Sequence, residues 1–295
     1  MKFLWNKICN NDKVKCQNMN YSVLMSVYRK EKAEYLQIAM DSMWNQTAPT
    51  DDFVLICDGP LTEELDTVIF EMKEKHTDAL NVIRFEKNMG LGRALQVGVN
   101  ACKNELIARM DSDDISLPDR CEKELAFFET HPDVSIVGGV IEEFTDITPG
   151  AFVPNEIKTK RVVPETAEEI ALFAKKRNPF NHPSVMYCKE AVLAAGNYQD
   201  VRYMQDYYLW IHMLIAGFKG YNLQETLVYM RADSNLFKRR SGKQYRDIQL
   251  NLFRYMKDQK FITTGQYMNS CILRSASSMA PNWLRERMFR RILRK

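Results

Sequence analysis

Three carboxylates crowd into four consecutive residues, Asp111-Ser112-Asp113-Asp114, directly after the apolar run Glu105–Met110. Like charges this close together raise the free energy of the chain unless a cation lies between them. Hard oxygen ligands of this type suit Mg²⁺ or Mn²⁺, and an ion held by one or two carboxylates keeps positions open for substrate phosphates. The motif therefore indicates a metal and diphosphate site; the alternative interpretation is a solvated turn that caps the next helix.

Two further polar segments follow predicted strands. Asp58 comes directly after the buried run Phe53–Cys57 and before Gly59. Its carboxylate could accept a hydrogen bond from a nucleobase or a sugar hydroxyl, although an isolated Asp-Gly pair is also typical of a turn. The loop Asn88–Arg93 has two glycines just before a predicted helix, where backbone amides can approach an anion. This loop matches neither the GxGxxG pattern nor a P-loop.

The elements that must position these segments alternate between strand and helix. Apolar runs bounded by turn residues predict strands at 21–27, 53–57, 81–85, 105–110, 134–141, 183–188 and 226–231. Helical periodicity predicts helices at 31–46, 61–75, 91–101, 118–130, 165–177, 189–195, 206–216, 244–256 and 265–278. The alternation predicts parallel βαβ units in an α/β fold, with helices flanking the sheet. Such sheets bind ligands at the carboxyl ends of their strands, where all three polar segments fall. Residues 145–164 show no period and predict a loop or an extended ribbon.

Composition excludes several classes of protein. With 45% hydrophobic and 11% aromatic residues, the 295-residue chain can bury a large core, so global disorder is excluded. No apolar run reaches the roughly 18–20 residues that span a bilayer, and residues 1–17 lack the apolar segment of a secretory signal, so we expect a cytoplasmic protein. The seven cysteines are scattered without a CxxC pair, which predicts free core thiols.

The formal charge of +3 conceals a division along the chain. Residues 231–295 hold 16 Lys/Arg against 4 Asp/Glu, whereas residues 1–230 hold 25 against 34. Part of the excess lies in residues 282–295, where a helical wheel puts apolar and arginine side chains on different sides. This pattern suits an anionic membrane surface, although a helix docked on the protein body by its apolar stripe is the alternative. No recognition motif for nucleic acid accompanies the charge, so we expect no nucleic-acid partner.

Taken together and in order, the motifs resemble the inverting nucleotide-sugar glycosyltransferases of family 2, which have the GT-A fold. Within that family the chain looks most like bacterial enzymes of O-antigen and exopolysaccharide assembly. The resemblance covers about residues 20–245. It is carried by the segments SVLMSVY, LICDG, EKNMGLGRALQVG and ARMDSDD, followed by NHPSVM, GNY and QDYYLW.

The resemblance implies a role for each matching residue. Ser26, Val27 and Tyr28 stand where the first strand meets the nucleotide, and Asp58 stands where a carboxylate contacts the uracil or ribose. The second nucleotide-side segment is matched by Asn88, Gly90 and Arg93. Asp111 and Asp113 match the DxD pair; Asp113 is expected to ligate the metal directly, and Asp111 to contact the ribose or sugar as well as the metal.

Asp206 matches the carboxylate proposed as general base. The family often has Glu-Asp at this motif, and here Gln205 precedes Asp206, which leaves one carboxylate. A second departure is Cys57, where another Asp is frequent.

Residues outside these motifs predict contacts with the acceptor or with phosphate. His182 precedes Pro183 and either makes such a contact or is a hydrogen-bonded structural histidine. Arg239 and Arg240 belong to a basic loop at 237–243 that could fold over the diphosphate, although such charge runs are usually solvated.

The resemblance implies transfer of a hexose, with galactose or glucose favoured, from a UDP-sugar to a saccharide acceptor linked to undecaprenyl diphosphate. The expected enzyme uses Mg²⁺ or Mn²⁺ and is peripheral on the inner face of a bacterial plasma membrane. We divide the chain into an N-terminal extension (1–20), a GT-A domain (21–245) and a helical C-terminal region (246–295). The alternatives are a sugar-1-phosphate nucleotidyltransferase and a non-catalytic, membrane-recruited module that binds nucleotide or saccharide. The first would want a glycine-rich loop after the first strand, which the segment Tyr28-Arg29-Lys30-Glu31 lacks.

Overall fold

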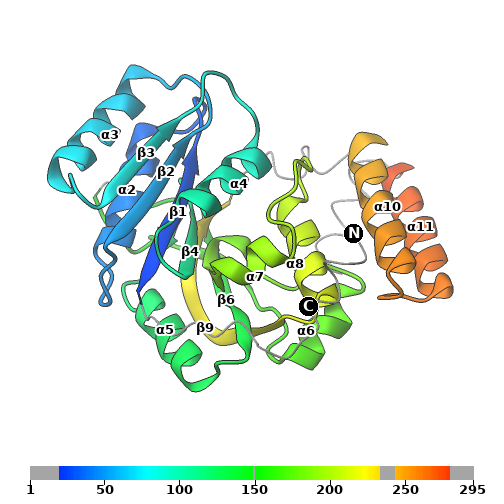
Figure 1. Cartoon of the computed structure of the whole chain (residues 1–295). Coiled ribbons are helices and arrows are strands. Elements are labelled where there is room, and N and C mark those ends of the chain that lie inside the picture. The colour runs from blue at the N-terminus through cyan, green and yellow to red at the C-terminus, as the bar shows by residue number, and fades with distance from the viewer. Residues whose placement is uncertain (1–19, 149, 233–242, 280–295) are drawn as a thin grey trace.

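The computed structural model of the chain describes residues 20–148, 150–232 and 243–279. Through this part runs a nine-stranded mixed sheet in the order β3-β2-β1-β4-β8-β6-β9-β5, with β7 paired to β6 (Figure 1). The strands are β1 (Tyr21–Val27), β2 (Asp52–Cys57), β3 (Leu80–Arg84), β4 (Leu106–Asp111), β5 (Ile115–Ser116), β6 (Val134–Phe144), β7 (Ile157–Arg161), β8 (Met186–Cys188) and β9 (Lys219–Arg231).

Helices cover both faces of this sheet (Figure 1). They are α2 (Ala33–Trp44), α3 (Glu63–Lys75), α4 (Leu91–Ala101), α5 (Arg120–Thr130), α6 (Ala167–Ala174), α7 (Lys189–Ala194), α8 (Gln205–Ile215), α10 (Lys243–Asp258) and α11 (Thr264–Met279). Alternate residues of β1 define the two faces, as the period of a strand requires. Val23 and Met25 pack in one core with α2, α3 and α5, whereas Leu24 packs in the other with α4, α7 and α8.

The first half of the sheet is parallel, as the sequence predicts. β2, β1 and β4 pair in parallel, and β3 pairs in parallel with β2. All six residues of β2 are buried, which is typical of a strand covered on both faces. Thr62 caps α3 by accepting a hydrogen bond from the backbone N–H of Leu65, as expected for a threonine before a helix.

The second half departs from a purely parallel arrangement. β8 pairs antiparallel with both β4 and β6, so a reversed strand lies at the centre of the sheet. The predicted strand at 183–188 is shorter, because residues His182–Ser184 form a 3₁₀ turn around Pro183. The strand predicted at 226–231 begins earlier, at Lys219, and follows β6 through irregular register. In the segment 145–164, β7 forms the extended ribbon that was one of two expectations.

α5 buries an ion pair beneath the sheet. Arg120 Nε donates to Glu124 Oε2 at 3.2 Å, and both side chains are fully buried. The same guanidinium donates to the backbone oxygens of Arg109 and Val185, which ties α5 to β4 and to the start of β8. Burial raises the pKa of Glu124 to about 7 despite the opposing charge of Arg120.

α10 and α11 form a helical hairpin beside α8 (Figure 1). Leu252, Phe253 and Met256 of α10 share a buried cluster with Tyr207 and Ile211 of α8. The Tyr208 hydroxyl also donates to the backbone oxygen of Ile248 at 3.1 Å. The hairpin is thus packed directly on the helix that begins with Gln205 and Asp206.

The described residues include five cysteines that form no disulfide, and four of them are buried, in agreement with the prediction of core thiols. Among the same residues, no helix combines the length and the hydrophobicity needed to cross a membrane.

Candidate active site

The predicted polar segments meet at the carboxyl ends of the parallel strands. In the sheet register, Ser26 lies beside Asp111 on one side and Ile56 on the other, and Val27 lies beside Cys57. Tyr28 follows at the end of β1 with 37% of its surface exposed. The convergence of these segments at one edge of the sheet is therefore confirmed.

Asp58 anchors the loop that follows β3. Its carboxylate accepts from the backbone N–H groups of Met89 (2.6 Å) and Gly90 (3.0 Å) and from Asn88 Nδ2 (2.9 Å). Only 4% of the residue is exposed. Both oxygens of Asp58 thus already have donors, so its first effect is to fix the conformation of residues 88–90.

Glycine is required at two points of this loop contact. Gly59 has φ +93°, and a Cβ at this position would lie 2.7 Å from the backbone nitrogen of Asn88. Gly90, with φ +88°, directly precedes α4. Arg93 on the first turn of α4 is exposed and donates to Gln96.

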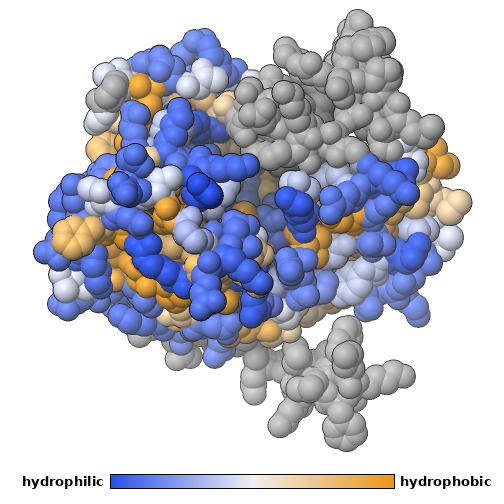
Figure 2. Space-filling model, turned by 90° about the horizontal axis from the view of Figure 1, so that it is seen from above, coloured by the Kyte–Doolittle hydropathy of each residue, from blue (hydrophilic) through white to orange (hydrophobic). Residues whose placement is uncertain are grey.

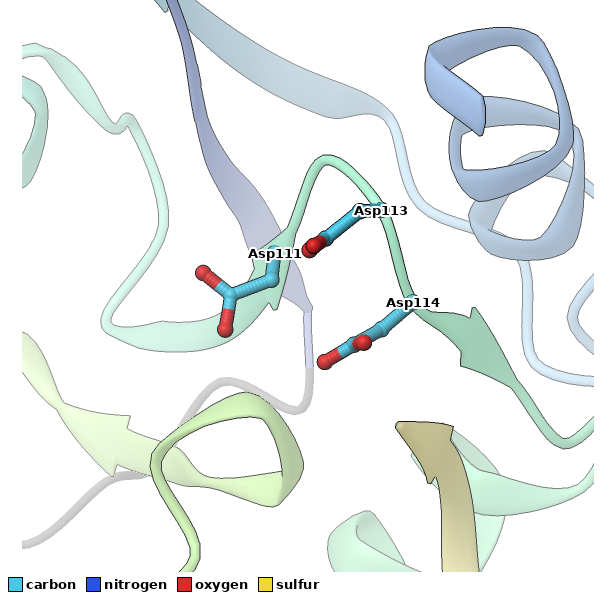
Figure 3. A group of neighbouring side chains, drawn as sticks. All are labelled: Asp111, Asp113 and Asp114. Atoms are coloured by element: carbon cyan, nitrogen blue, oxygen red, sulfur yellow. The ribbon is translucent and has the colours of Figure 1, made fainter. Parts of the chain in front are cut away.

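The acidic turn between β4 and β5 brings its three carboxylates together. One oxygen from each of Asp111, Asp113 and Asp114 lies within 4.8 Å of the others. Figure 3 shows the three side chains extending to the same side of the turn. Burial, with the charges of Asp111 and Glu31, raises the pKa of Asp113 to about 7. Burial and the charges of Asp113 and Asp111 raise the pKa of Asp114 well above its ordinary value.

Arg109, which the sequence did not single out, pairs with the first of these carboxylates. It lies two residues before Asp111 on β4, so both side chains project from the same face. Arg109 Nη1 donates to Asp111 Oδ2 at 2.7 Å and Nη2 donates to Asp111 Oδ1, while 1% of the arginine is exposed. Burial alone would lower the pKa of Arg109, but Asp111 raises it. This bidentate pair fixes Asp111 and compensates its charge.

Arg231, at the end of β9, contacts the carboxylate of Asp114 and the backbone of Asp113. Its backbone N–H donates to Asp114 Oδ1 at 2.8 Å, and its Nε donates to the backbone oxygen of Asp113 at 3.1 Å. The guanidinium stacks over the ring of Tyr35, with the carbon 3.6 Å from the ring centroid, and also over Phe144. Asp114 Oδ2 is buried, and no group of the described residues donates a hydrogen bond to it.

The residues of the turn fit a divalent cation. A buried carboxylate oxygen without a donor, next to two further carboxylates, is costly unless it receives a proton or a metal ion. Of the three carboxylates, Asp111 forms the ion pair with Arg109, so Asp113 and Asp114 would be left to hold Mg²⁺ or Mn²⁺, with Asp111 at the same point.

Asp206 lies in the first turn of α8, directly after Gln205. Within the described residues, Asn178 is its one hydrogen-bond donor, with Nδ2 2.6 Å from Asp206 Oδ2. The charges of Arg109, Asp206 and Asp111 all act on the Tyr198 hydroxyl. The pKa of Tyr198 is itself raised, chiefly by burial.

His182 joins the site through Tyr198. Its Nε2 shares a hydrogen bond of 2.9 Å with the Tyr198 hydroxyl, the contact expected of a structural histidine. Burial, together with the positive charge of Arg109, lowers the pKa of His182 well below its ordinary value, so the ring is neutral. Trp210 of α8 is fully buried.

The start of α4 also packs against the start of α8. A Cβ on Gly92 would lie 2.5 Å from the backbone oxygen of Gln199 and 3.4 Å from the Cβ of Gln205. The second glycine of the Asn88–Arg93 loop therefore permits close packing next to Asp206. Arg239, Arg240 and the segment 282–295 lie outside the described residues.

Comparison with known proteins places this site in a family. The family model for Glycosyl transferase family 2 matches residues 22–194, which include the acidic turn and the loop held by Asp58. This chain belongs to glycosyl transferase family 2. The family resemblance is thus confirmed, and the assignment argues against the nucleotidyltransferase alternative.

Two curated relatives match this glycosyltransferase over nearly its whole length. The amylovoran biosynthesis glycosyltransferase AmsE of Erwinia amylovora is 36% identical over 264 residues, 88% of this chain and 94% of the relative. The UDP-Gal:alpha-D-GlcNAc-diphosphoundecaprenol beta-1,3-galactosyltransferase of Escherichia coli is 33% identical over 277 residues, 93% of this chain and 97% of the relative.

A solved structure agrees on the fold. The mannosyltransferase PcManGT from Pyrobaculum calidifontis, in complex with GDP-Man and Mn²⁺, superposes with a TM-score of 0.60 at 13% identity. The match covers 97% of this chain and 79% of that one. The architecture is that of a GT-A glycosyltransferase, as the sequence predicts.

Proposed function

We propose that this glycosyltransferase moves a hexose, galactose or glucose, from a UDP-sugar to a saccharide linked to undecaprenyl diphosphate, in O-antigen or exopolysaccharide synthesis. The observation that carries the proposal is the 33% identity, over 93% of the chain, to an enzyme named for UDP-Gal and a GlcNAc-diphosphoundecaprenol acceptor. AmsE, a glycosyltransferase of amylovoran biosynthesis, supports the same class of product.

In this proposal, the residues at the ends of β1, β2 and β4 bind the donor UDP-sugar. Ser26, Val27 and Tyr28 line the nucleotide at the end of β1. Asp58 acts with Asn88 and Gly90 through the loop that it fixes, and Arg93 lies on the same side. Asp113 and Asp111, together with Asp114, would hold Mg²⁺ or Mn²⁺, which as a Lewis acid counters the charge that develops on the departing diphosphate.

Asp206 then acts as general base in a single displacement. The acceptor hydroxyl oxygen forms a bond to the anomeric carbon while the bond from that carbon to the diphosphate oxygen breaks. The hydroxyl proton passes to Asp206, and the bonding electron pair leaves with UDP. Asn178 donates a hydrogen bond to Asp206 Oδ2 and so orients the carboxylate with its other oxygen toward the acceptor. Attack from the face opposite the leaving group inverts the anomeric configuration, and general-base catalysis contributes about 10²–10⁴ in rate.

Other residues are assigned to the acceptor side. His182 supports it through Tyr198, and Arg239 and Arg240 contact phosphate. The segment 282–295 binds an anionic membrane surface, which places the enzyme on the inner face of the plasma membrane, and the GT-A domain ends near residue 245.

A panel of nucleotide sugars tests the proposal. The full chain is incubated with Mn²⁺, a GlcNAc-diphosphate lipid and each donor in turn, and UDP release is measured. We expect the fastest acceptor-dependent release with UDP-galactose or UDP-glucose, and little with GDP-mannose. Acceptor-dependent turnover with a GDP-sugar alone would overturn the assignment of the donor, and no turnover with any donor would favour the non-catalytic module.

A further inference from the structure

The outward face of α11 carries exposed apolar side chains. Met268, Ile272 and Leu273 are 53%, 65% and 60% exposed, and with Gly265 and Asn269 they lie on one side of the helix. In Figure 2, hydrophobic atoms also reach the surface at the right-hand edge, where Figure 1 has the α10–α11 hairpin. We call Met268, Ile272 and Leu273 the apolar stripe.

Two basic side chains of α10 lie next to α11, and further basic residues follow α11 in the sequence. Arg254 of α10 forms a hydrogen bond to Tyr267, and Lys257 Nζ lies 5.2 Å from the centroid of the same ring. Asp258, which pairs with Lys257 at 3.2 Å, is the acidic residue beside them. Over residues 259–295 the chain has eight Lys/Arg and one Asp/Glu. Six of these cations follow α11 directly, in residues 280–295.

We propose that the apolar stripe is a membrane-docking surface that inserts among anionic lipid headgroups. An apolar face beside Arg254 and Lys257, followed in the sequence by a segment rich in Lys and Arg, suits such a surface, whereas two copies of this positively charged face would repel one another.

The packing of the hairpin connects this surface to the chemistry. Arg274 of α11 donates to the backbone oxygen of Lys176 at 2.9 Å, two residues before the Asn178 that orients Asp206. α10 packs on α8, and Asp206 lies in the first turn of α8. Docking of α11 therefore sets the position of Asp206 relative to the bilayer. The inference rests on the proposed function, because a lipid-linked acceptor requires the active site to face a membrane.

Vesicle binding by the full chain tests the proposal. The wild type is compared with a double variant, Ile272→Ser with Leu273→Ser, by co-sedimentation with vesicles of phosphatidylglycerol and phosphatidylethanolamine or of phosphatidylcholine alone. The matched control is Phe70→Ser, which removes a side chain that is 65% exposed on α3. We expect the double variant to bind the anionic vesicles at least about tenfold more weakly, and the control to bind like the wild type.

Three results would overturn the proposal. The double variant could bind the anionic vesicles as tightly as the wild type, the wild type could fail to bind them, or the wild type could bind neutral vesicles equally well. A lower molecular mass of the double variant by light scattering, without a change in vesicle binding, would assign the stripe to a second copy of the chain. Transfer to a water-soluble acceptor is measured in parallel and stays at the wild-type rate in the double variant. If the wild type shows no transfer to this acceptor, the result counts against the proposed function and not against the docking surface.

Discussion

At the residue scale, the carboxylates of the site differ in what compensates their charge. Asp111 has a buried bidentate arginine, whereas Asp114 has one backbone donor and one oxygen without a partner in the part of the chain that the structure describes. Asp113 is crowded by Asp111 and Glu31, which helps to raise its pKa to about 7. The turn thus stores unfavourable electrostatic free energy in the absence of a cation, which is the expected signature of a metal site.

Asp113→Asn tests this uneven compensation. At neutral pH without metal, we expect the variant to be more stable than the wild type by about 1 kcal/mol, because the amide removes the like-charge repulsion. We also expect Mn²⁺ to raise the melting temperature of the wild type more than that of the variant, and transfer activity to fall at least about 100-fold in the variant.

The measurements are thermal melts in EDTA and in Mn²⁺, together with UDP release. Asp78→Asn, an exposed substitution of the same type, is the control. A variant that loses stability in EDTA, or that keeps wild-type transfer, would contradict the account of the turn.

At the element scale, short contacts between segments distant in the sequence hold the site. Asp58 at the end of β2 fixes residues 88–90, and this requires the backbone of Gly59 to pass close to Asn88. Gly92 similarly permits α4 to approach the residues just before α8. These contacts bring residues 88–92 and Asp206 to one edge of the sheet.

Gly59→Ala is expected to displace the loop that Asp58 holds. The added Cβ would lie 2.7 Å from the backbone nitrogen of Asn88, in addition to the strain of a positive φ. Gly217→Ala is a matched control, because Gly217 also has positive φ (+87°) but would meet nothing within 4 Å. We expect Gly217→Ala to lose about 1 kcal/mol of stability, Gly59→Ala to lose more because of the clash, and only Gly59→Ala to bind UDP at least about tenfold more weakly. Calorimetric titration with UDP measures this, and equal UDP affinity in the two variants would contradict it.

The buried Arg120–Glu124 pair gives a prediction about pH. The pKa of Glu124 rises from its ordinary value near 4.5 to about 7 on folding, so the folded state binds more protons than the unfolded state in this interval. Stability from this group therefore falls as pH increases from about 4.5 to about 7, by at most about 1.4 kcal/mol per pH unit. Glu124→Gln cannot ionise and should gain stability relative to the wild type between about pH 5 and about pH 7.

Urea unfolding of both proteins at the two pH values measures the difference, in which the other titrating groups cancel. Glu129→Gln, an exposed glutamate on the same helix, should show no such change. A constant difference between Glu124→Gln and wild type across the interval would show that the burial of Glu124 does not control its protonation.

At the scale of the whole molecule, the predictable part of the fold is the parallel half of its sheet. There the strands are buried runs that end in polar turns, and α4 has the predicted bounds of Leu91–Ala101. The mixed half is less predictable, because β5 has two residues and β9 begins in a polar stretch stabilised by its pairing with β6. Such pairings depend on long-range contacts that local periodicity does not record.

The candidate site shows the same division. The sequence marks Asp58, Asp111 and Asp113 through motifs at strand ends. It does not mark Arg109, Arg231 or Asn178, whose roles arise from contacts formed only in the folded chain. For Arg109 a signal was present, since the two-residue spacing to Asp111 on a strand puts both side chains on one face. The contact of Asn178 with Asp206 spans 28 residues and has no local pattern.

The most direct test of the central claim is the anomeric configuration and rate of hexose transfer by wild type and Asp206→Asn. The full chain, Mn²⁺, UDP-galactose or UDP-glucose and a GlcNAc-diphosphate lipid are combined, and the product is analysed by NMR. We predict a β-linked hexose with one UDP released per transfer, and a rate about 10²–10⁴ lower in Asp206→Asn with UDP-sugar binding retained. An α-linked product, or an Asp206→Asn variant that turns over at the rate of the Asp78→Asn control, would contradict the account.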